Sequence, residues 1–243
     1  MKEELVLNAF RTRWRTRINR LMRVKPVCNA VFWVRYFWLV RICRSLRAFQ
    51  DLKLVTANGF EHNEKAILQG QPSDRILKLI LPLSVLDILD ENSRILAIGV
   101  RYETDLLYLS AYGFSNTRGL DLFSYSPWVD LGNMHNLPYA NDSFDATIMG
   151  WTLAYSDDPV RAASEIIRVT KNGGVVGISN TYYPKHVIDT FIRNGEPMGL
   201  IHRRQTVVEL LELFKENVKH VYFRHDSRPD KQGACVVIFS LKK

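Results

Sequence analysis

The chain has 243 residues, with 33 lysines and arginines against 25 aspartates and glutamates, so its formal net charge is +8. This length can bury a substantial core, and we expect one catalytic-size domain with an extension. The three cysteines, Cys28, Cys43 and Cys235, are too few and too scattered for a disulfide framework or a zinc site. Composition therefore argues against a disulfide-rich scaffold, predicts no metal site and favours a reducing, cytoplasmic compartment.

The basic excess lies entirely at the N-terminus. Residues 1–50 hold 12 lysines and arginines against Glu3 and Glu4, which gives +10, whereas the remainder carries −2. Arginines alternate in this stretch with large aromatic residues such as Trp14, Trp33 and Trp38. We expect a basic, aromatic helical arm. It suits an anionic membrane surface, packing on the core or on a partner subunit, or nucleic acid, which we rank last.

The apolar part of the arm does not predict a membrane span. Residues 27–40 form its most apolar run, which is 14 residues long and contains Arg35, whereas a spanning helix needs about 20 apolar residues. The run also begins late for a signal peptide, and no small-residue cleavage site follows it. We therefore expect a cytoplasmic protein that can associate peripherally with the inner face of the membrane through residues 1–50.

Residues 51–72 show a weak pattern punctuated by Gly59, Gly70 and Pro72, which is typical of a linker. A helix should then start near Ser73 and Asp74 and run to Leu89, with Pro82 bending or dividing it. From residue 94 onwards, short apolar runs alternate with longer amphipathic ones, a pattern typical of βαβ units in a parallel sheet. The sequence thus predicts a doubly wound α/β domain over residues 73–243.

The individual elements can be placed within this domain. Residues 94–99 should form its first strand, and residues 103–112 a crossover helix that Gly113 ends. Residues 122–131 form an aromatic link after the second strand, and they could line a pocket or plug the surface. The later segments are expected to be a strand at 144–149, a helix at 160–169, a strand at 175–179, a helix at 206–216, and strands at 218–225 and 234–241.

Three motifs carry a resemblance to a known family: Leu-Pro-Tyr at 137–139, Asp-Ser-Phe-Asp at 142–145, and Arg-Val-Thr-Lys-Asn-Gly-Gly at 168–174. In order and spacing the chain here resembles the class I S-adenosylmethionine-dependent methyltransferases of type 11. The resemblance implies a Rossmann-like sheet of seven strands, the last one antiparallel, with S-adenosylmethionine as cofactor. It also implies that the loop after the fourth strand meets both methyl donor and acceptor.

The same resemblance implies which residues hold the cofactor. The first turn, 99–103, keeps one of the family's three glycines, and Arg101 should start near the methionine carboxylate. Asp121 should accept hydrogen bonds from the ribose hydroxyls, although it could be a plain strand-end carboxylate. Asn133 should receive the adenine amino group, with Met134 against the ring. The implied cofactor site consists of Gly99, Arg101, Asp121, Leu122, Asn133, Met134 and Trp151.

Three residues are candidates for removing a proton from the acceptor: His135, Tyr155 and Asp157. In-line methyl transfer to oxygen depends mainly on alignment, so a base needs to remove only one proton. Each candidate also has a structural interpretation. A histidine in a loop is often structural, and Tyr155 is better suited to positioning substrate because its ordinary pKa is near 10. Asp157 can belong to the cap of the following helix.

The function that we expect is methyl transfer from S-adenosylmethionine to a small-molecule or glycan acceptor. Segments 124–135 and 150–156 look like those of methyltransferase-like proteins encoded with bacterial surface-polysaccharide enzymes. They favour O-methylation of a sugar or a surface-glycan precursor. The alternative is a cofactor-free, methyltransferase-like scaffold, which Val100, Arg101 and Tyr102 suggest by standing among the missing glycines. A nucleic-acid methyltransferase ranks third because the chain lacks an Asn/Asp-Pro-Pro-Tyr/Phe motif.

Overall fold

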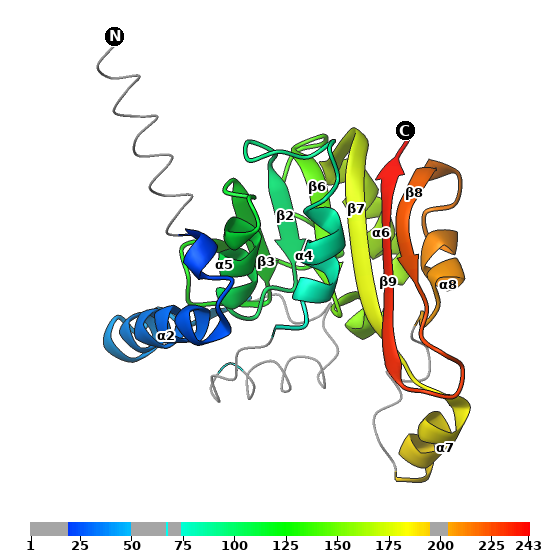
Figure 1. Cartoon of the computed structure of the whole chain (residues 1–243), viewed down its shortest axis with the longest axis horizontal. Coiled ribbons are helices and arrows are strands. Elements are labelled where there is room, and N and C mark those ends of the chain that lie inside the picture. The colour runs from blue at the N-terminus through cyan, green and yellow to red at the C-terminus, as the bar shows by residue number, and fades with distance from the viewer. Residues whose placement is uncertain (1–18, 50–66, 68–73, 195–203) are drawn as a thin grey trace.

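A seven-stranded sheet forms the centre of the protein (Figure 1). The structure is a computed structural model, and it describes residues 19–49, 67, 74–194 and 204–243. The beginning of the arm and nearly all of the predicted linker therefore lie outside the described residues. The strand order is β5-β3-β2-β6-β7-β9-β8.

The sheet confirms the predicted topology. Neighbouring strands from β5 to β7 are parallel, whereas β9 runs antiparallel to both of its neighbours, β7 and β8. The last strand of the chain is thus the antiparallel one. The strands are β2 (Ile95–Ile98), β3 (Thr117–Asp121), β5 (Val129–Leu131), β6 (Phe144–Gly150), β7 (Thr170–Tyr182), β8 (Val218–His225) and β9 (Gly233–Leu241).

Helices cover both faces of this sheet, which confirms the doubly wound architecture. Helices α4 (Leu77–Leu83) and α5 (Thr104–Ala111) lie in front of it in Figure 1, and α6 (Pro159–Val169) lies behind. Helix α8 (Val207–Glu212) packs on the same side as α6. Side chains of β2 alternate between the two layers, since Ile95 joins the α4–α5 core and Leu96 joins the α6–α8 core.

Capping residues and a glycine explain where several helices begin and end. The Asp158 carboxylate accepts the backbone N–H of Arg161 and so caps α6, and Pro159 occupies the first turn, where no N–H is needed. Thr206 and Glu209 form a reciprocal capping box at α8. After α5 the chain turns through Gly113, whose φ of 107° is open to glycine at little cost. These boundaries agree with the predicted ones to within a few residues.

Three expected elements differ from the structure. The predicted helix 73–89 is reduced to α4, because Pro82 lies inside it without a backbone N–H and the chain continues as turns after Leu83. Strand β7 begins at Thr170 rather than Val175, since Thr170 already pairs with β6. The link 122–131 contains two strands, β5 and the short β4 (Phe123–Ser124).

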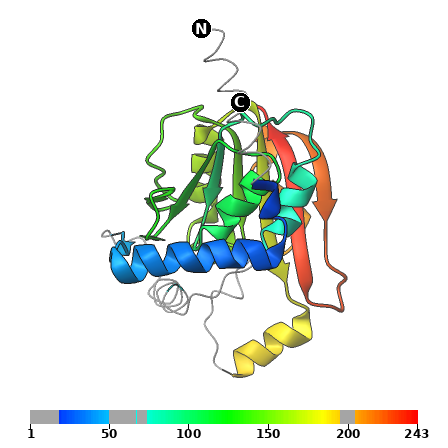
Figure 2. The ribbon, with the colours of Figure 1, turned by 60° about the vertical axis from the view of Figure 1, so that its left-hand side comes forward.

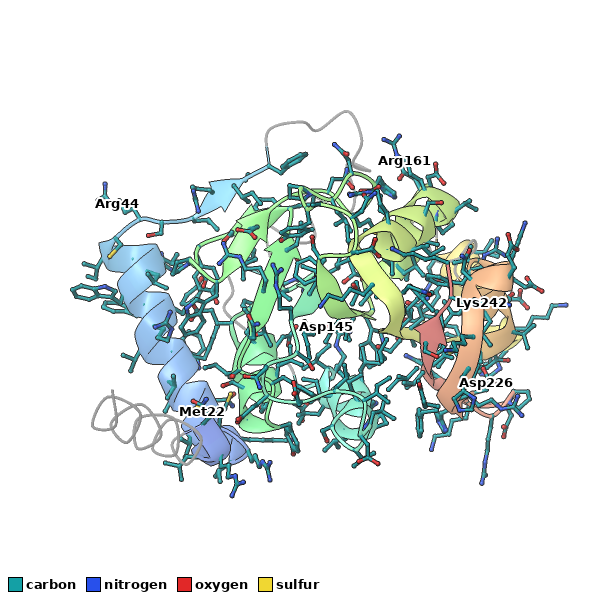
Figure 3. All side chains as sticks on the ribbon, turned by 90° about the horizontal axis from the view of Figure 1, so that it is seen from above. Met22, Arg44, Asp145, Arg161, Asp226 and Lys242 are labelled. Atoms are coloured by element: carbon teal, nitrogen blue, oxygen red, sulfur yellow. The ribbon has the colours of Figure 1, made fainter. Side chains whose placement is uncertain are left out.

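The described part of the arm packs on the domain. Helix α2 (Lys25–Tyr36) continues into the π-helix η1 (Phe37–Ile42), and β1 (Arg47–Ala48) pairs with β4. Helix α2 lies beyond the β3–β5 side of the sheet, toward the end at which β2 and β3 finish (Figures 1 and 2). Seen from above, it lies on the opposite side of the domain from β8 (Figure 3). The remaining elements are η3 (Leu153–Tyr155), α7 (Lys185–Arg193) and η5 (Lys215–Asn217).

Helix α2 is attached through one buried stripe. Its residues Cys28, Phe32 and Tyr36 recur every fourth position and are buried. Phe32 and Tyr36 join a separate aromatic cluster with Tyr102, Phe123 and Tyr125. The Tyr36 hydroxyl also donates a hydrogen bond of 2.6 Å to the carbonyl of Ile67. Packing on the core, one of the three interpretations of the arm, therefore describes this face of α2.

Candidate active site

The candidate site lies where β2, β3 and β6 end. In open α/β sheets, ligands bind in the crevice outside the carboxyl ends of the strands. Three predicted cofactor residues stand at these ends: Gly99 after β2, Asp121 at the last position of β3, and Trp151 after β6. The sheet thus brings together loops that are up to 52 residues apart in the chain, from Gly99 to Trp151.

The turn after β2 is closely packed although it has lost two glycines. Gly99 has a φ of 82°, and a Cβ built on it would stand 1.8 Å from Oγ1 of Thr152. Glycine is therefore required here both for its conformation and for its size. Val100 and Tyr102 are buried, the first against Gly119 and the second against Phe32, at 5.4 Å between ring centroids. These two side chains fill the protein interior.

The arm holds the end of this turn through Glu103, whose side chain is wholly buried. Arg35 donates two hydrogen bonds to its carboxylate, at 2.7 and 2.9 Å, and Ser126 donates a third. The Arg35 guanidinium also lies 3.9 Å from the centre of the Trp128 ring. Its hydrogen bonds to Glu103 raise the pKa of Arg35 above the ordinary value. Sequence reasoning missed this pair, although Arg35 was conspicuous in an apolar helix.

Asp121 is a buried carboxylate at the end of β3. One of its oxygens accepts the backbone N–H of Phe123 at 3.1 Å. Desolvation raises the pKa of Asp121 to about 6, while that backbone hydrogen bond and the charge of Arg101 partly offset the rise. Further hydrogen-bond donors would stabilise the charged form of this carboxylate, and the hydroxyls of a bound ligand could supply them.

A second carboxylate, Asp105, lies near Asp121 in the first turn of α5. Although solvent still reaches part of its side chain, burial raises the pKa of Asp105 to about 7. The positive charges of Arg75 and Arg101 oppose this rise, and the negative charge of Asp121 adds to it. The positive charge of Arg101 therefore lowers the pKa of both carboxylates, Asp105 and Asp121. Neither Asp105 nor Arg75 is among the site residues that the sequence predicts.

Trp151 stands in an unusual backbone conformation beside this charged group. Its φ is 62°, which is uncommon for a bulky residue and is seen mostly at tight or functional turns. The backbone N–H donates to the Ser179 carbonyl at 2.7 Å, and the indole N–H donates to Thr181 at 2.9 Å. The Arg75 guanidinium lies 5.7 Å from the centre of the indole ring. The segment before α4 thus reaches over the loop after β6.

Two of the three candidate bases meet in a second group of side chains. Nε2 of the buried His135 lies 2.7 Å from the Ser156 hydroxyl and 3.5 Å from the Asp157 carboxylate. Burial lowers the pKa of His135, and the charges of Asp157 and Asp158 only partly offset this. The imidazole is therefore neutral at physiological pH and able to accept a proton. Tyr155 is exposed, and Asp158, not Asp157, caps α6.

The remaining predicted cofactor residues already have protein contacts. The side-chain oxygen of Asn133 accepts the backbone N–H of His135 at 3.0 Å. The role of Asn133 toward adenine stays a prediction. Met134 is partly buried against the α6–α8 core, and Leu122 packs against the aromatic cluster of the arm. Their roles in holding the cofactor also stay predictions.

The aromatic link 122–131 supports the arm and the edge of the sheet. The Tyr125 hydroxyl accepts the backbone N–H of Glu103 at 3.2 Å. Asp130 lies in a hollow of about 420 Å³ beside the edge strand β5. There its carboxylate accepts hydrogen bonds from Arg118, at 2.7 Å, and from Tyr139, at 2.9 Å. Asp130 is therefore engaged at the sheet edge.

The fold is that of a Rossmann-like α/β protein, with its candidate site residues at the carboxyl ends of the strands. Residues 96–178 match the sequence model of a family described as a methyltransferase domain. A curated relative, the demethylmenaquinone methyltransferase of Desulfitobacterium hafniense, is 44% identical over 45 residues, and the match spans only 18% of the length of each protein. Over residues 96–178 the chain is therefore similar to a methyltransferase domain, and its fold is that expected of the class I S-adenosylmethionine-dependent type.

Solved structures agree with this fold. A chain of the complex that contains the Haloferax volcanii Trm112 methyltransferase activator superposes with a TM-score of 0.56 at 17% identity, covering 76% of this chain and 96% of that chain. The cyclase SpnF superposes with a TM-score of 0.50 at 16% identity, covering 88% and 96% of the two chains. These likenesses concern the fold alone, because one fold can carry different reactions.

Two features are absent from the part of the chain that the structure describes. No described helix combines the length and the apolar character needed to cross a membrane. Among the same residues, no group of three or more His, Cys, Asp and Glu side chains could hold a metal ion.

Proposed function

We propose that the protein transfers a methyl group from S-adenosylmethionine to an acceptor bound at the same strand ends. The observation that carries this proposal is the buried Asp121 carboxylate at the end of β3 in a methyltransferase domain. Hydroxyl donors from a ribose would stabilise its charged form. Gly99 provides the one position where the turn has no side chain. The chemistry of these residues fits the cofactor.

Each protein residue has a defined task in this proposal. The cofactor, when bound, supplies an electrophilic methyl group. Asp121 would accept hydrogen bonds from the ribose hydroxyls, and Arg101 would place a positive charge for the methionine carboxylate. His135 would accept the proton of the acceptor, because its pKa is lowered and Ser156 and Asp157 orient its ring.

The acceptor that we favour is a hydroxyl of a sugar or of a surface-glycan precursor. The support is the similarity of segments 124–135 and 150–156 to methyltransferase-like proteins encoded with bacterial surface-polysaccharide enzymes. A neutral imidazole also suits removal of a hydroxyl proton. The short relative is named for demethylmenaquinone, so quinones belong in the same test. Methylation of quinones but not of sugars would overturn the sugar assignment and leave the methyltransferase proposal intact.

Calorimetry with S-adenosylmethionine and its demethylated product tests cofactor binding directly. We expect micromolar binding by the wild-type chain. Asp121→Ala should weaken binding by about 1–3 kcal/mol, because charge-assisted hydrogen bonds to the ribose are lost. Asp230→Ala, which changes an exposed aspartate on the loop before β9, is the matched control and should bind like the wild type. Equal weakening in both variants would refute the role of Asp121.

A cofactor-free scaffold is the second candidate, and one observation favours it. The Thr152 side chain occupies the space directly over Gly99, and the neighbouring turn is filled by the buried Val100 and Tyr102. In this second candidate function, that packing leaves the turn without room for either ligand. The absence of heat with both ligands, on protein shown to be folded by circular dichroism, would establish the scaffold and exclude the enzyme.

A further inference from the structure

Helix α2 and the π-helix η1 together expose a second apolar face. Opposite the buried stripe lies what we call the outer face, whose large apolar side chains are 47–71% exposed. A helix on the surface of a soluble domain normally presents polar residues on the side away from the core. The outer face consists of Trp33, Val34, Phe37, Trp38 and Ile42.

Cationic side chains accompany this face. Arg41 and Arg44 are exposed at its end, and Arg44 lies on the outer side of the arm in Figure 3. Arg35, by contrast, is neutralised by Glu103. The sequence contains no aspartate or glutamate from residue 5 to residue 50. The arm therefore brings no negative charge of its own to the outer face.

We propose that the outer face docks on an anionic membrane surface. Tryptophan and phenylalanine side chains are well suited to the boundary between headgroups and acyl chains, and arginines there bind lipid phosphates. A second copy of the chain is a poor occupant, because two such faces would bring Arg41 and Arg44 of both copies together without a counter-charge. The charge therefore selects a negatively charged partner, and the aromatic residues select one with an apolar interior.

The position of the arm gives this docking a consequence. Helix α2 lies beyond the β3–β5 side of the sheet, toward the end at which β2 and β3 finish (Figures 1 and 2). The buried stripe of the same helix contacts Tyr102 through Phe32. A membrane against the outer face would thus be separated from the turn after β2 by one helix.

Vesicle sedimentation of the full chain tests the proposal without using activity. The vesicles are phosphatidylglycerol mixed with phosphatidylcholine, compared with phosphatidylcholine alone. We expect binding only to the anionic vesicles. Phe37→Ser/Trp38→Ser should weaken it at least about tenfold through lost apolar burial. Arg41→Glu/Arg44→Glu should weaken it at least about 25-fold, since each basic residue contributes about fivefold near the surface.

A matched control separates this face from general hydrophobicity. Val160→Ser/Val208→Ser changes side chains that are 60% and 63% exposed on α6 and α8, behind the sheet. It should bind like the wild type, and all variants should keep the wild-type melting temperature because the changed side chains are exposed. Binding that survives both arm variants would overturn the proposal. Wild-type protein that stays in the supernatant with anionic vesicles would also overturn the proposal. The same holds if the wild-type protein forms a dimer in solution that Phe37→Ser/Trp38→Ser dissociates.

Discussion

Two regions of this domain are each held by an arginine, but the arginines come from different places. In the segment 137–174, Arg168 donates to the carbonyls of Leu137 and Tyr139, at 2.9 and 2.7 Å, and pairs with Glu165 three residues before it. At the turn 99–103, Arg35 reaches Glu103 from the arm, 68 residues away. The first arrangement lies inside the family domain, whereas the second joins it to an extension.

This difference explains why the two regions differ in their likeness to the family. Arg168 and Leu137 belong to the motifs that carry the resemblance, and their contacts fix the chain beside β6, so these motifs report the fold. The turn 99–103 would face the cofactor, yet its Tyr102 and Glu103 are adapted to the arm. The turn thus lacks two of the family's glycines at the place where the arm packs on it. Buried side chains hold the turn in place instead.

The largest effect should come from breaking the arm contact. Arg35→Met leaves the wholly buried Glu103 carboxylate without its counter-charge and should lower the free energy of unfolding by about 3 kcal/mol in urea denaturation. Adding Glu103→Gln to that variant should recover part of the loss, because no uncompensated charge stays buried. A double variant as unstable as the single one, or more so, would show that Arg35 acts through packing on Trp128 alone.

The arginine of the other region should matter somewhat less. Arg168→Met removes hydrogen bonds to Leu137 and Tyr139 and the pair with Glu165, but its side chain is partly open to water. We expect a loss of about 2 kcal/mol in the free energy of unfolding. Arg224→Met, at an exposed position of β8, is the control and should change it by less than about 0.5 kcal/mol. Equal losses would contradict a specific role for Arg168.

Sequence patterns were sufficient for the fold because they report local rules. The apolar runs at 94–99 and 144–149 indicated strands buried on both faces, and the structure confirms them as β2 and β6. Pro82 correctly indicated that the predicted helix 73–89 would be interrupted. It did not indicate that the helix would end at Leu83. The start of β7 was missed because Gly173 and Gly174 look like a turn, although Thr170 already pairs with β6. Strand pairing through such a bulge depends on the neighbouring strand.

The candidate site was only half predictable. Gly99 and Asp121 could be placed because a residue at a strand end has its location fixed by the strand. Arg75 could not, since its contact with Trp151 crosses 76 residues of chain. The raised pKa of Asp105 depends on two arginines and a second carboxylate that only the folded chain assembles. Whether the site binds the cofactor stays a prediction.

A pH series sharpens the comparison at the turn itself. In the folded protein the pKa of Asp121 is raised to about 6, and ribose hydroxyls bind the charged carboxylate. Affinity for S-adenosylmethionine should therefore rise about tenfold between pH 5 and pH 7, as measured by calorimetry. Asp121→Asn has no charge to lose and should give a nearly flat profile. A wild-type profile as flat as that of the variant would remove Asp121 from the cofactor site.

The smallest effect should come from Asp105, and its sign is the informative part. Burial raises the pKa of Asp105 to about 7 in the folded protein, above its ordinary value of 3.8. The folded state therefore binds this proton more tightly than the unfolded state, and the contribution of Asp105 to stability falls as the pH rises through that interval. At pH 8 Asp105 is charged in the folded and the unfolded state, and burying that charge lowers the free energy of unfolding. Solvent access limits this loss to less than about 1 kcal/mol. Asp105→Asn should thus melt slightly higher than the wild type at pH 8, with the difference vanishing near pH 4. A variant that melts lower at pH 8 would show instead that Arg75 and Arg101 need this charge, so that the carboxylate stabilises the turn after β2.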